Sequence, residues 1–138
     1  LKGEEVIVME TKTVLVVDDE PDLVDTIKFG LERAGYEVLT AYNGFEALGV
    51  ARAEEPDVII LDVMLPKKNG YEVSRLIRDE QVNGSIQKPL KIIILTARRP
   101  ESEKSAEFYQ DWARADEYLY KPFEMDELIA LVEKCVKQ

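Results

Sequence analysis

Polar side chains that could do phosphoryl chemistry stand directly after four short apolar runs of the chain. They are Asp18 and Asp19 after residues 13–17, Asp62 after residues 58–61, Thr96 after residues 91–95, and Lys121 after residues 117–120. A carboxylate beside a divalent cation can act as a nucleophile toward phosphorus and form an aspartyl phosphate. An ammonium group and a hydroxyl can neutralise and hydrogen-bond the phosphoryl oxygens. These residue types therefore indicate a candidate site for accepting a phosphoryl group.

Three carboxylates in one place also indicate a metal. Two unit charges roughly 4 Å apart repel by about 4 kcal/mol at an effective dielectric constant of about 20, and Lys121 offsets only part of that repulsion. The chain has no histidine and one cysteine, Cys135, so a metal must be bound by oxygen, which suits Mg²⁺. The alternatives are that the acids are solvated separately, or that Asp62 only caps the turn after it.

The apolar runs predict five strands, at residues 13–17, 37–41, 58–61, 91–95 and 117–120. Short runs of large aliphatic residues are typical of strands buried on both faces of a parallel sheet. Helical patterns alternate with these strands: one helix begins at Pro21, others are predicted near residues 71–78 and 126–136, and another ends near Ala113. Residues 79–90 are expected to form a long connection. The alternation predicts an α/β domain with a doubly wound, five-stranded parallel sheet flanked by helices, and ligands bind such sheets at the carboxyl ends of the strands.

Composition restricts the possible functions. The 138 residues are expected to form one domain at residues 13–138, preceded by a lead at 1–12 that is disordered, a remnant of a longer chain or an extra strand. With 28 acidic and 18 basic residues the net charge is -10, which argues against direct binding of nucleic acid. No apolar stretch approaches the ~20 residues of a membrane span and no signal peptide is evident, so a cytoplasmic location is expected. Strong nucleotide binding is not expected, because no glycine-rich phosphate loop follows the first strand.

The polar motifs, taken in order, resemble those of the receiver domain of bacterial two-component response regulators. The motifs are Asp18-Asp19, Asp62-Val63-Met64-Leu65-Pro66, Asn69-Gly70, Thr96-Ala97 and Lys121-Pro122-Phe123. The resemblance covers about residues 13–136 and implies a flavodoxin-like fold of the receiver type. It implies a signalling protein of a phosphorelay, whose only chemistry is its own phosphorylation and dephosphorylation. Its phosphodonor would be a histidine kinase or a histidine phosphotransfer protein.

The resemblance also implies which residues accept the phosphoryl group and bind the metal. Asp62 is expected to be the phosphoacceptor. Asp19 is expected to be the principal metal ligand and Asp18 its acidic neighbour, and Asp62 and the backbone carbonyl of Met64 would complete the site. The metal would be Mg²⁺, with Mn²⁺ as a substitute.

Further residues are implied as phosphoryl-binding and switch groups. Lys121 would bind the phosphoryl group and precede a cis bond to Pro122, and Thr96 would supply a switch hydroxyl. The family's aromatic switch residue corresponds to Tyr118, although alternation in the strand places Tyr120 on the same side. Phosphorylation would recruit Thr96 and turn Tyr118 inward, which would remodel the face made by the fourth helix, fifth strand and fifth helix.

Several points stay open at this level. The activated face could bind a downstream protein, form a homodimer, or act on an output domain missing from this sequence. Arg114 stands where the family usually has glycine, which predicts a different end to the fourth helix. A phosphohydrolase of the haloacid dehalogenase type is a rival interpretation, but such enzymes carry a second acid at the position of Met64. A receiver-like docking module that is never phosphorylated is another.

Overall fold

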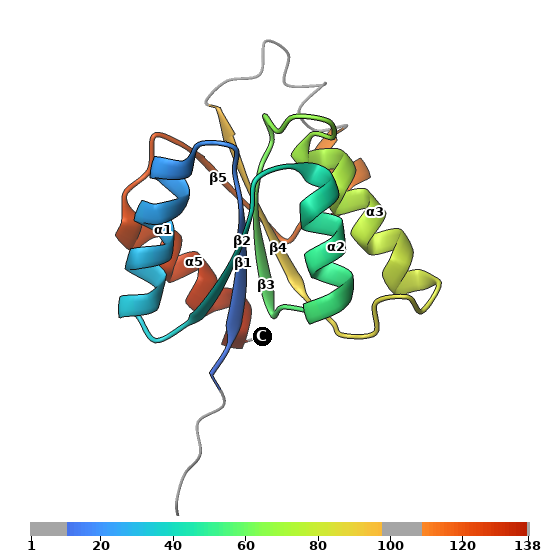
Figure 1. The fold of residues 1–138 in the computed structure, drawn as a ribbon, viewed down its shortest axis with the longest axis horizontal. Coiled ribbons are helices and arrows are strands. Elements are labelled where there is room, and N and C mark those ends of the chain that lie inside the picture. The colour runs from blue at the N-terminus through green and yellow to red at the C-terminus, as the bar shows by residue number, and fades with distance from the viewer. Residues whose placement is uncertain (1–10, 98–108, 138) are drawn as a thin grey trace, which may run out of the picture.

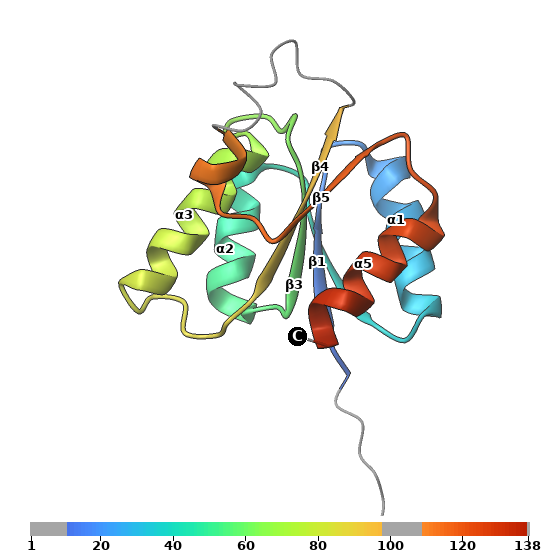
Figure 2. The same ribbon diagram turned by 180° about the vertical axis from the view of Figure 1, so that it is seen from behind.

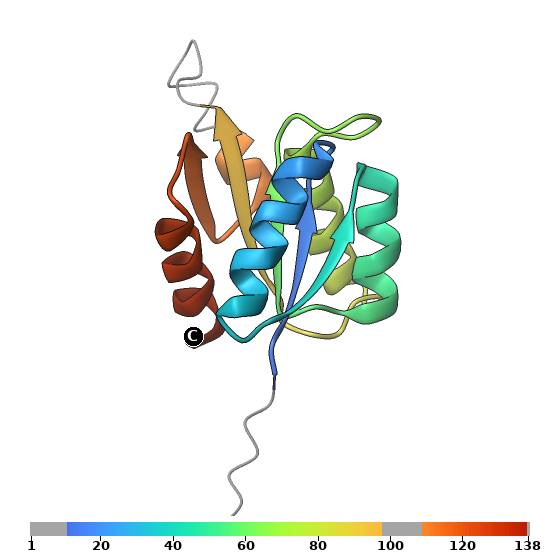
Figure 3. The same ribbon diagram turned by 60° about the vertical axis from the view of Figure 1, so that its left-hand side comes forward.

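The strands of the chain form one parallel sheet and end at the same edge of it. In the computed structural model, which describes residues 11–97 and 109–137, the strands are β1 (Thr13–Val17), β2 (Glu37–Ala41), β3 (Val58–Asp62), β4 (Lys91–Ala97) and β5 (Glu117–Lys121). Their order is β2-β1-β3-β4-β5, and every pair is parallel. The strand arrows accordingly point the same way (Figure 3). The doubly wound sheet predicted from the sequence is confirmed.

Helices cover both faces of this sheet (Figures 1 and 2). Helices α1 (Pro21–Arg33) and α5 (Met125–Lys137) lie on one face, and α2 (Gly44–Glu54) and α3 (Gly70–Val82) lie on the other. Residues 109–113 are also helical and lie beside α3, and this helix ends at Ala113 as predicted. The earlier part of this helix was expected within residues 98–108, which lie outside the described residues. The first ten residues of the predicted lead lie outside them as well.

The core is split by the sheet into two apolar layers. Every residue of β3 is buried, and in β1 only the first residue is partly exposed. The outer strands β2 and β5 are only partly buried. The aliphatic runs of β1 and β3 therefore form the centre of the fold because both of their faces are covered by helices.

Helix α3 is longer than the sequence pattern predicted. It runs from Gly70 to Val82 instead of ending near residue 78, so the connection to β4 covers only residues 83–90. The last turn is held by its own side chains: Arg78 donates a hydrogen bond to the Leu90 carbonyl at 3.0 Å, and Gln81 donates to the Lys88 carbonyl at 2.8 Å. Residues 79–81 look like a loop in the sequence because they are polar and the partner that holds Gln81 lies beyond the helix.

Two local features agree with expectation. The peptide bond between Lys121 and Pro122 is cis. Pro21 occupies the start of α1, where a proline costs no hydrogen bond because the first N–H groups of a helix have no partner within it. Within residues 11–97 and 109–137, the structure contains no helix long and apolar enough to cross a membrane.

Candidate functional site

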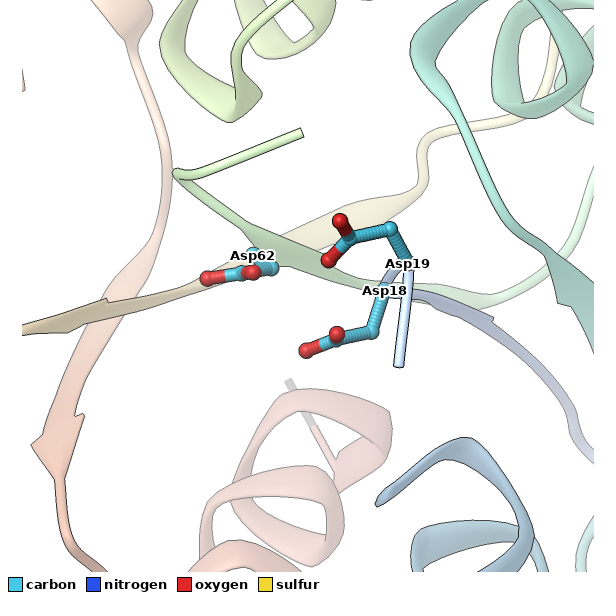
Figure 4. Close-up of side chains that lie close together, drawn as sticks. All are labelled: Asp18, Asp19 and Asp62. Carbon is cyan, nitrogen blue, oxygen red and sulfur yellow. The ribbon is translucent and has the colours of Figure 1, made fainter. Parts of the chain in front are cut away.

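The three predicted acids meet at the carboxyl ends of the two central strands. Val17 of β1 pairs with Leu61 of β3, so the next residue in each chain segment, Asp18 and Asp62, leaves the sheet at the same level. One carboxylate oxygen from each of Asp18, Asp19 and Asp62 lies within 4.8 Å of the others. Figure 4 shows the carboxylates of Asp18 and Asp19 extending from the end of β1 toward the side on which Asp62 lies.

Lys121 supplies the positive charge next to this group. Its Nζ atom lies 3.2 Å from Asp62 Oδ1 and 3.5 Å from Asp18 Oδ2. Lys121 is the last residue of β5, where it pairs with Ala97 of β4. Its side chain reaches the acids although β4 lies between β5 and β3 in the sheet. The side chains of Asp18 and Asp62 are 1% and 5% exposed, whereas that of Lys121 is 27% exposed. The site is thus a buried acid pair closed on one side by a partly exposed ammonium.

Burial and charge shift the titration of these groups. Burial, followed by the neighbouring Asp18 charge, raises the pKa of Asp62 above its ordinary value, while Lys121 and the Met64 backbone N–H oppose this shift. Burial alone would lower the pKa of Lys121, but the Asp62 and Asp18 carboxylates outweigh it and raise the pKa. Both shifts include a contribution from neighbouring carboxylates, as expected where three acids lie beside one lysine.

The residues present fit a hard cation. Asp18 Oδ2 is buried and accepts no hydrogen bond from any described residue, and its neighbouring cation Lys121 lies at ion-pair distance only. Asp18 Oδ1 is already used by the Glu20 backbone N–H at 3.0 Å. The available donor atoms are carboxylate oxygens, which Mg²⁺ prefers. The acidic triad is therefore typical of a Mg²⁺ site.

The loop after Asp62 is held in place by the start of α3. The Gly70 N–H donates to the Val63 carbonyl at 3.0 Å, and a Cβ atom on Gly70 would overlap the Asp62 backbone carbonyl. Asn69 and Glu72 form a capping box that begins α3 at this position.

The Met64 side chain is 74% exposed, so only its backbone takes part in the site. Sequence reasoning named the Asn69-Gly70 pair but not its role. The Asn69–Glu72 spacing was the signal that could have placed the helix start against Asp62.

The two predicted switch residues lie farther out on β4 and β5. The Thr96 hydroxyl donates to the Ala97 carbonyl at 3.4 Å, and among the described residues Asp62 receives its side-chain hydrogen bond from Lys121 instead. Tyr118 is half-buried, and its hydroxyl donates to the Gln110 carbonyl at 2.9 Å. Burial, then the charge of a neighbouring tyrosine, raises the pKa of Tyr118 to about 12. Tyr120 is 41% exposed, so of the two tyrosines Tyr118 is the one engaged with the protein interior.

Comparison with known families decides what this site belongs to. The family model of the response regulator receiver domain matches residues 14–133. The chain belongs to the response regulator receiver family. Its acidic pocket of Asp18, Asp19 and Asp62 is the phosphoacceptor pocket of a receiver domain, which is a signalling component and not a conventional enzyme. Membership also implies a histidine kinase as partner.

Relatives with similar sequences and structures agree with this assignment. The receiver chain is 40% identical over 127 residues to the alkaline phosphatase synthesis transcriptional regulatory protein PhoP of Bacillus subtilis, covering 92% of this chain and 49% of that protein. It therefore spans about half the length of this curated relative. The receiver domain of the Francisella response regulator 1452 superposes with a TM-score of 0.79 at 31% identity, over 92% of this chain and 98% of that one. A BeF3-activated DrrB receiver domain superposes with a TM-score of 0.75 at 29% identity, over 94% of this chain and 100% of that one.

Proposed function

We propose that Asp62 is the residue of this receiver domain that accepts a phosphoryl group from a histidine kinase or a histidine phosphotransfer protein. The observation that carries the proposal is the placement of the Asp62 carboxylate, almost fully buried at the end of β3, with Lys121 Nζ 3.2 Å away and two further carboxylates within 4.8 Å. No other described group of His, Cys, Asp and Glu side chains has this geometry.

In the proposed reaction, an Asp62 carboxylate oxygen forms a bond to the phosphorus of the donor. The phosphorus–nitrogen bond of the donor phosphohistidine breaks, and its electron pair stays on the imidazole nitrogen. Lys121 stays within reach of Asp62, so its ammonium is placed to neutralise an oxygen of the transferred group. The Met64 backbone N–H favours the charged form of the Asp62 carboxylate, because it lowers the pKa of Asp62.

Asp18, Asp19, Asp62 and the Met64 backbone carbonyl are the residues proposed to hold Mg²⁺, or Mn²⁺ in its place. A bound divalent ion would supply charge neutralisation for the acids and for the phosphoryl oxygens. The Asp18 Oδ2 atom supports this role because it is buried, accepts no hydrogen bond from the described residues, and has beside it only the Lys121 ammonium at 3.5 Å, which it shares with Asp62.

We also propose that Thr96 and Tyr118 act as the switch. Among the described residues, the Thr96 hydroxyl makes one long hydrogen bond, to the neighbouring Ala97 carbonyl, and a bond of this length opposes its turning toward a phosphoryl group on Asp62 only weakly. Tyr118 is tied to the helix that ends at Ala113 through its bond to Gln110, so a change at Tyr118 reaches this helix. The face that includes β5 and α5 is the proposed output face, for a downstream protein, a further domain of the same protein or a second copy. β5 is an edge strand of the sheet, and among the described residues no further strand pairs with its outer side, so that side could take such contacts.

Mass spectrometry of the intact protein after incubation with acetyl phosphate and Mg²⁺ tests the acceptor. A mass increase of one phosphoryl group is expected, dependent on Mg²⁺ and absent from Asp62→Asn. The matched control is Asp25→Asn, which changes an exposed aspartate of α1 and should be phosphorylated like the wild type. Phosphorylation of Asp62→Asn at the wild-type rate would assign the acceptor to another residue. If neither acetyl phosphate nor beryllofluoride gave an adduct, the non-phosphorylated docking module would be the better description.

A further inference from the structure

Three side chains of α3 converge on consecutive backbone carbonyls at the end of the helix that precedes β5. Ser74 Oγ donates to the Ala113 carbonyl at 2.7 Å, and this hydrogen bond is buried. Arg75 Nη1 donates to the Trp112 carbonyl at 3.2 Å, and Arg78 Nε donates to the Arg114 carbonyl at 2.9 Å. We call Ser74, Arg75 and Arg78 the α3 clamp; Figure 2 shows the short helix lying along α3.

The clamp supplies hydrogen-bond donors to the carbonyls at the end of this helix. The last carbonyls of a helix have no partner within the helix, and they are usually satisfied by water or by a glycine-based turn. Here Arg114 itself adopts the left-handed conformation, with φ of 56°, that glycine would take at this position. The different helix end predicted from the missing glycine stays a prediction: Arg114 takes the left-handed conformation without being glycine, and the α3 clamp holds the carbonyls around it.

The clamp is continuous with the sheet and with Tyr118. Arg78 Nη2 also donates to Asp116 Oδ2 at 2.6 Å, and Asp116 Oδ2 accepts the Ile92 backbone N–H at 2.7 Å. Four residues before the clamped Arg114 carbonyl lies Gln110, whose carbonyl accepts the Tyr118 hydroxyl. The segment 110–116 is thus fixed from α3, from β4 and from β5 at once.

We propose that Ser74, Arg75 and Arg78 are positioning residues that hold segment 110–116 in the arrangement seen here, and so set how readily the domain accepts a phosphoryl group on Asp62. The inference rests on the proposed function. In the present arrangement the Thr96 hydroxyl bonds to Ala97 and not to Asp62, so the Thr96 part of the switch is not engaged in the form that the clamp holds. Engaging the switch moves Tyr118 and the helix bonded to it, and this movement strains or breaks the clamp.

Linkage then gives the expected direction of the effect. A phosphoryl group favours the engaged form by the difference between its binding free energies for the two forms. The clamp stabilises the other form, so part of this difference is used to overcome the clamp. Removing one clamp hydrogen bond lowers the cost of the rearrangement, so the affinity for a phosphoryl mimic should rise. Loss of one such bond is expected to raise the affinity about tenfold.

The experiment measures beryllofluoride affinity by calorimetry in the presence of saturating Mg²⁺. The test variants are Ser74→Ala and Arg75→Met; the second keeps an apolar chain over the Trp112 ring, which Arg75 covers at 5.9 Å. The control is Arg52→Met, which removes an arginine of α2 that donates to Glu80 of α3 at 2.6 and 2.7 Å but touches no clamp residue. Trp112 is the single tryptophan of the chain, so its fluorescence reports on the clamped segment directly.

Both clamp variants should bind beryllofluoride about tenfold more tightly than the wild type, while Arg52→Met binds as the wild type does. Beryllofluoride should also change Trp112 emission in the wild type, because the clamped segment moves. A purely structural role would lower the urea midpoint of the clamp variants without changing their affinity, and that result would overturn the inference. Absence of binding to the wild type would overturn the proposed function, and the inference with it.

Discussion

Replacing Lys121 by methionine tests whether the buried acids depend on this one ammonium. Methionine keeps the length and apolar packing of the lysine stem but removes its charge. In the wild type, Lys121 Nζ lies 3.2 Å from Asp62 and 3.5 Å from Asp18. The variant leaves two carboxylates, each at least 95% buried, with no ammonium between them.

The magnitude follows from these distances. At an effective dielectric constant of about 20, each lysine–carboxylate pair attracts by about 5 kcal/mol before the cost of removing the ions from water. Breaking a buried pair by removing one partner typically costs about 3–5 kcal/mol. Because the Lys121 side chain is 27% exposed and therefore partly screened, we expect a loss of about 2–3 kcal/mol in the free energy of unfolding at pH 8 without Mg²⁺.

The loss should depend on pH with a definite sign. The pKa of Asp62 is already raised by burial and by Asp18, and removing Lys121 raises it further. The folded variant therefore holds a proton that the unfolded chain has released, so it loses stability as the pH rises past the ordinary carboxyl value of 3.8 and regains it at lower pH. The gap to the wild type should be smaller at pH 5 than at pH 8, and Mg²⁺ should stabilise the variant more than the wild type.

Urea unfolding at the two pH values, with and without Mg²⁺, checks these points. The expected loss at pH 8 corresponds to a midpoint shift of about 1 M. Lys134→Met is the control: Lys134 of α5 pairs with Glu117 at 2.8 Å but is 55% exposed, so its midpoint should stay near that of the wild type at both pH values. A loss below about 1 kcal/mol that is equal at pH 5 and pH 8 would show that Lys121 does not neutralise the acid pair.

Three further substitutions or modifications test other parts of the structure. Gly70→Ala should lower the unfolding free energy by about 2 kcal/mol and weaken Mg²⁺ binding, because its Cβ would overlap the Asp62 carbonyl; unchanged Mg²⁺ affinity in a titration would contradict this. Arg114→Gly should raise the unfolding free energy by about 1 kcal/mol in urea, since glycine takes the left-handed conformation without strain, and a loss would mean that the arginine side chain contributes more than its backbone costs. Cys135 should react slowly with a thiol reagent at pH 8 until the protein is unfolded, because burial raises its pKa to about 11; fast labelling of the folded protein would refute the burial.

The central part of the fold was predictable because its signal is local. The aliphatic runs of β1 and β3 are buried on both faces, and a short run of large aliphatic residues bounded by turn residues is typical of such strands. The end of α3 was not predictable from its own residues. Residues 79–81 are polar and look like a loop, and the helix continues through them because Arg78 and Gln81 bond to the carbonyls of Leu90 and Lys88 on the connection that follows.

The candidate site also has residues that the sequence could identify and residues that it could not. Asp18, Asp19, Asp62 and Lys121 could be found because each ends a strand, and parallel strands bring their carboxyl ends together. The α3 clamp could not be found, because serine and arginine on a helix surface are usually solvated and nothing in the spacing identifies a carbonyl partner 36–39 residues away.

The division between the central and outer strands also bears on how a charge change at Asp62 would be transmitted. Asp18 directly follows β1 and Asp62 ends β3, and both strands are buried on both faces, so their movement in response to new charge would disturb the core. β5 is an edge strand and only partly buried, and Tyr118 and Lys121 stand on it. A response to phosphorylation is therefore easiest on the β5 side, where segment 110–116 and its bonds to α3 set the resistance. We expect the repulsion between the buried carboxylates to drive this response. The α3 clamp would set how much free energy is needed to move segment 110–116.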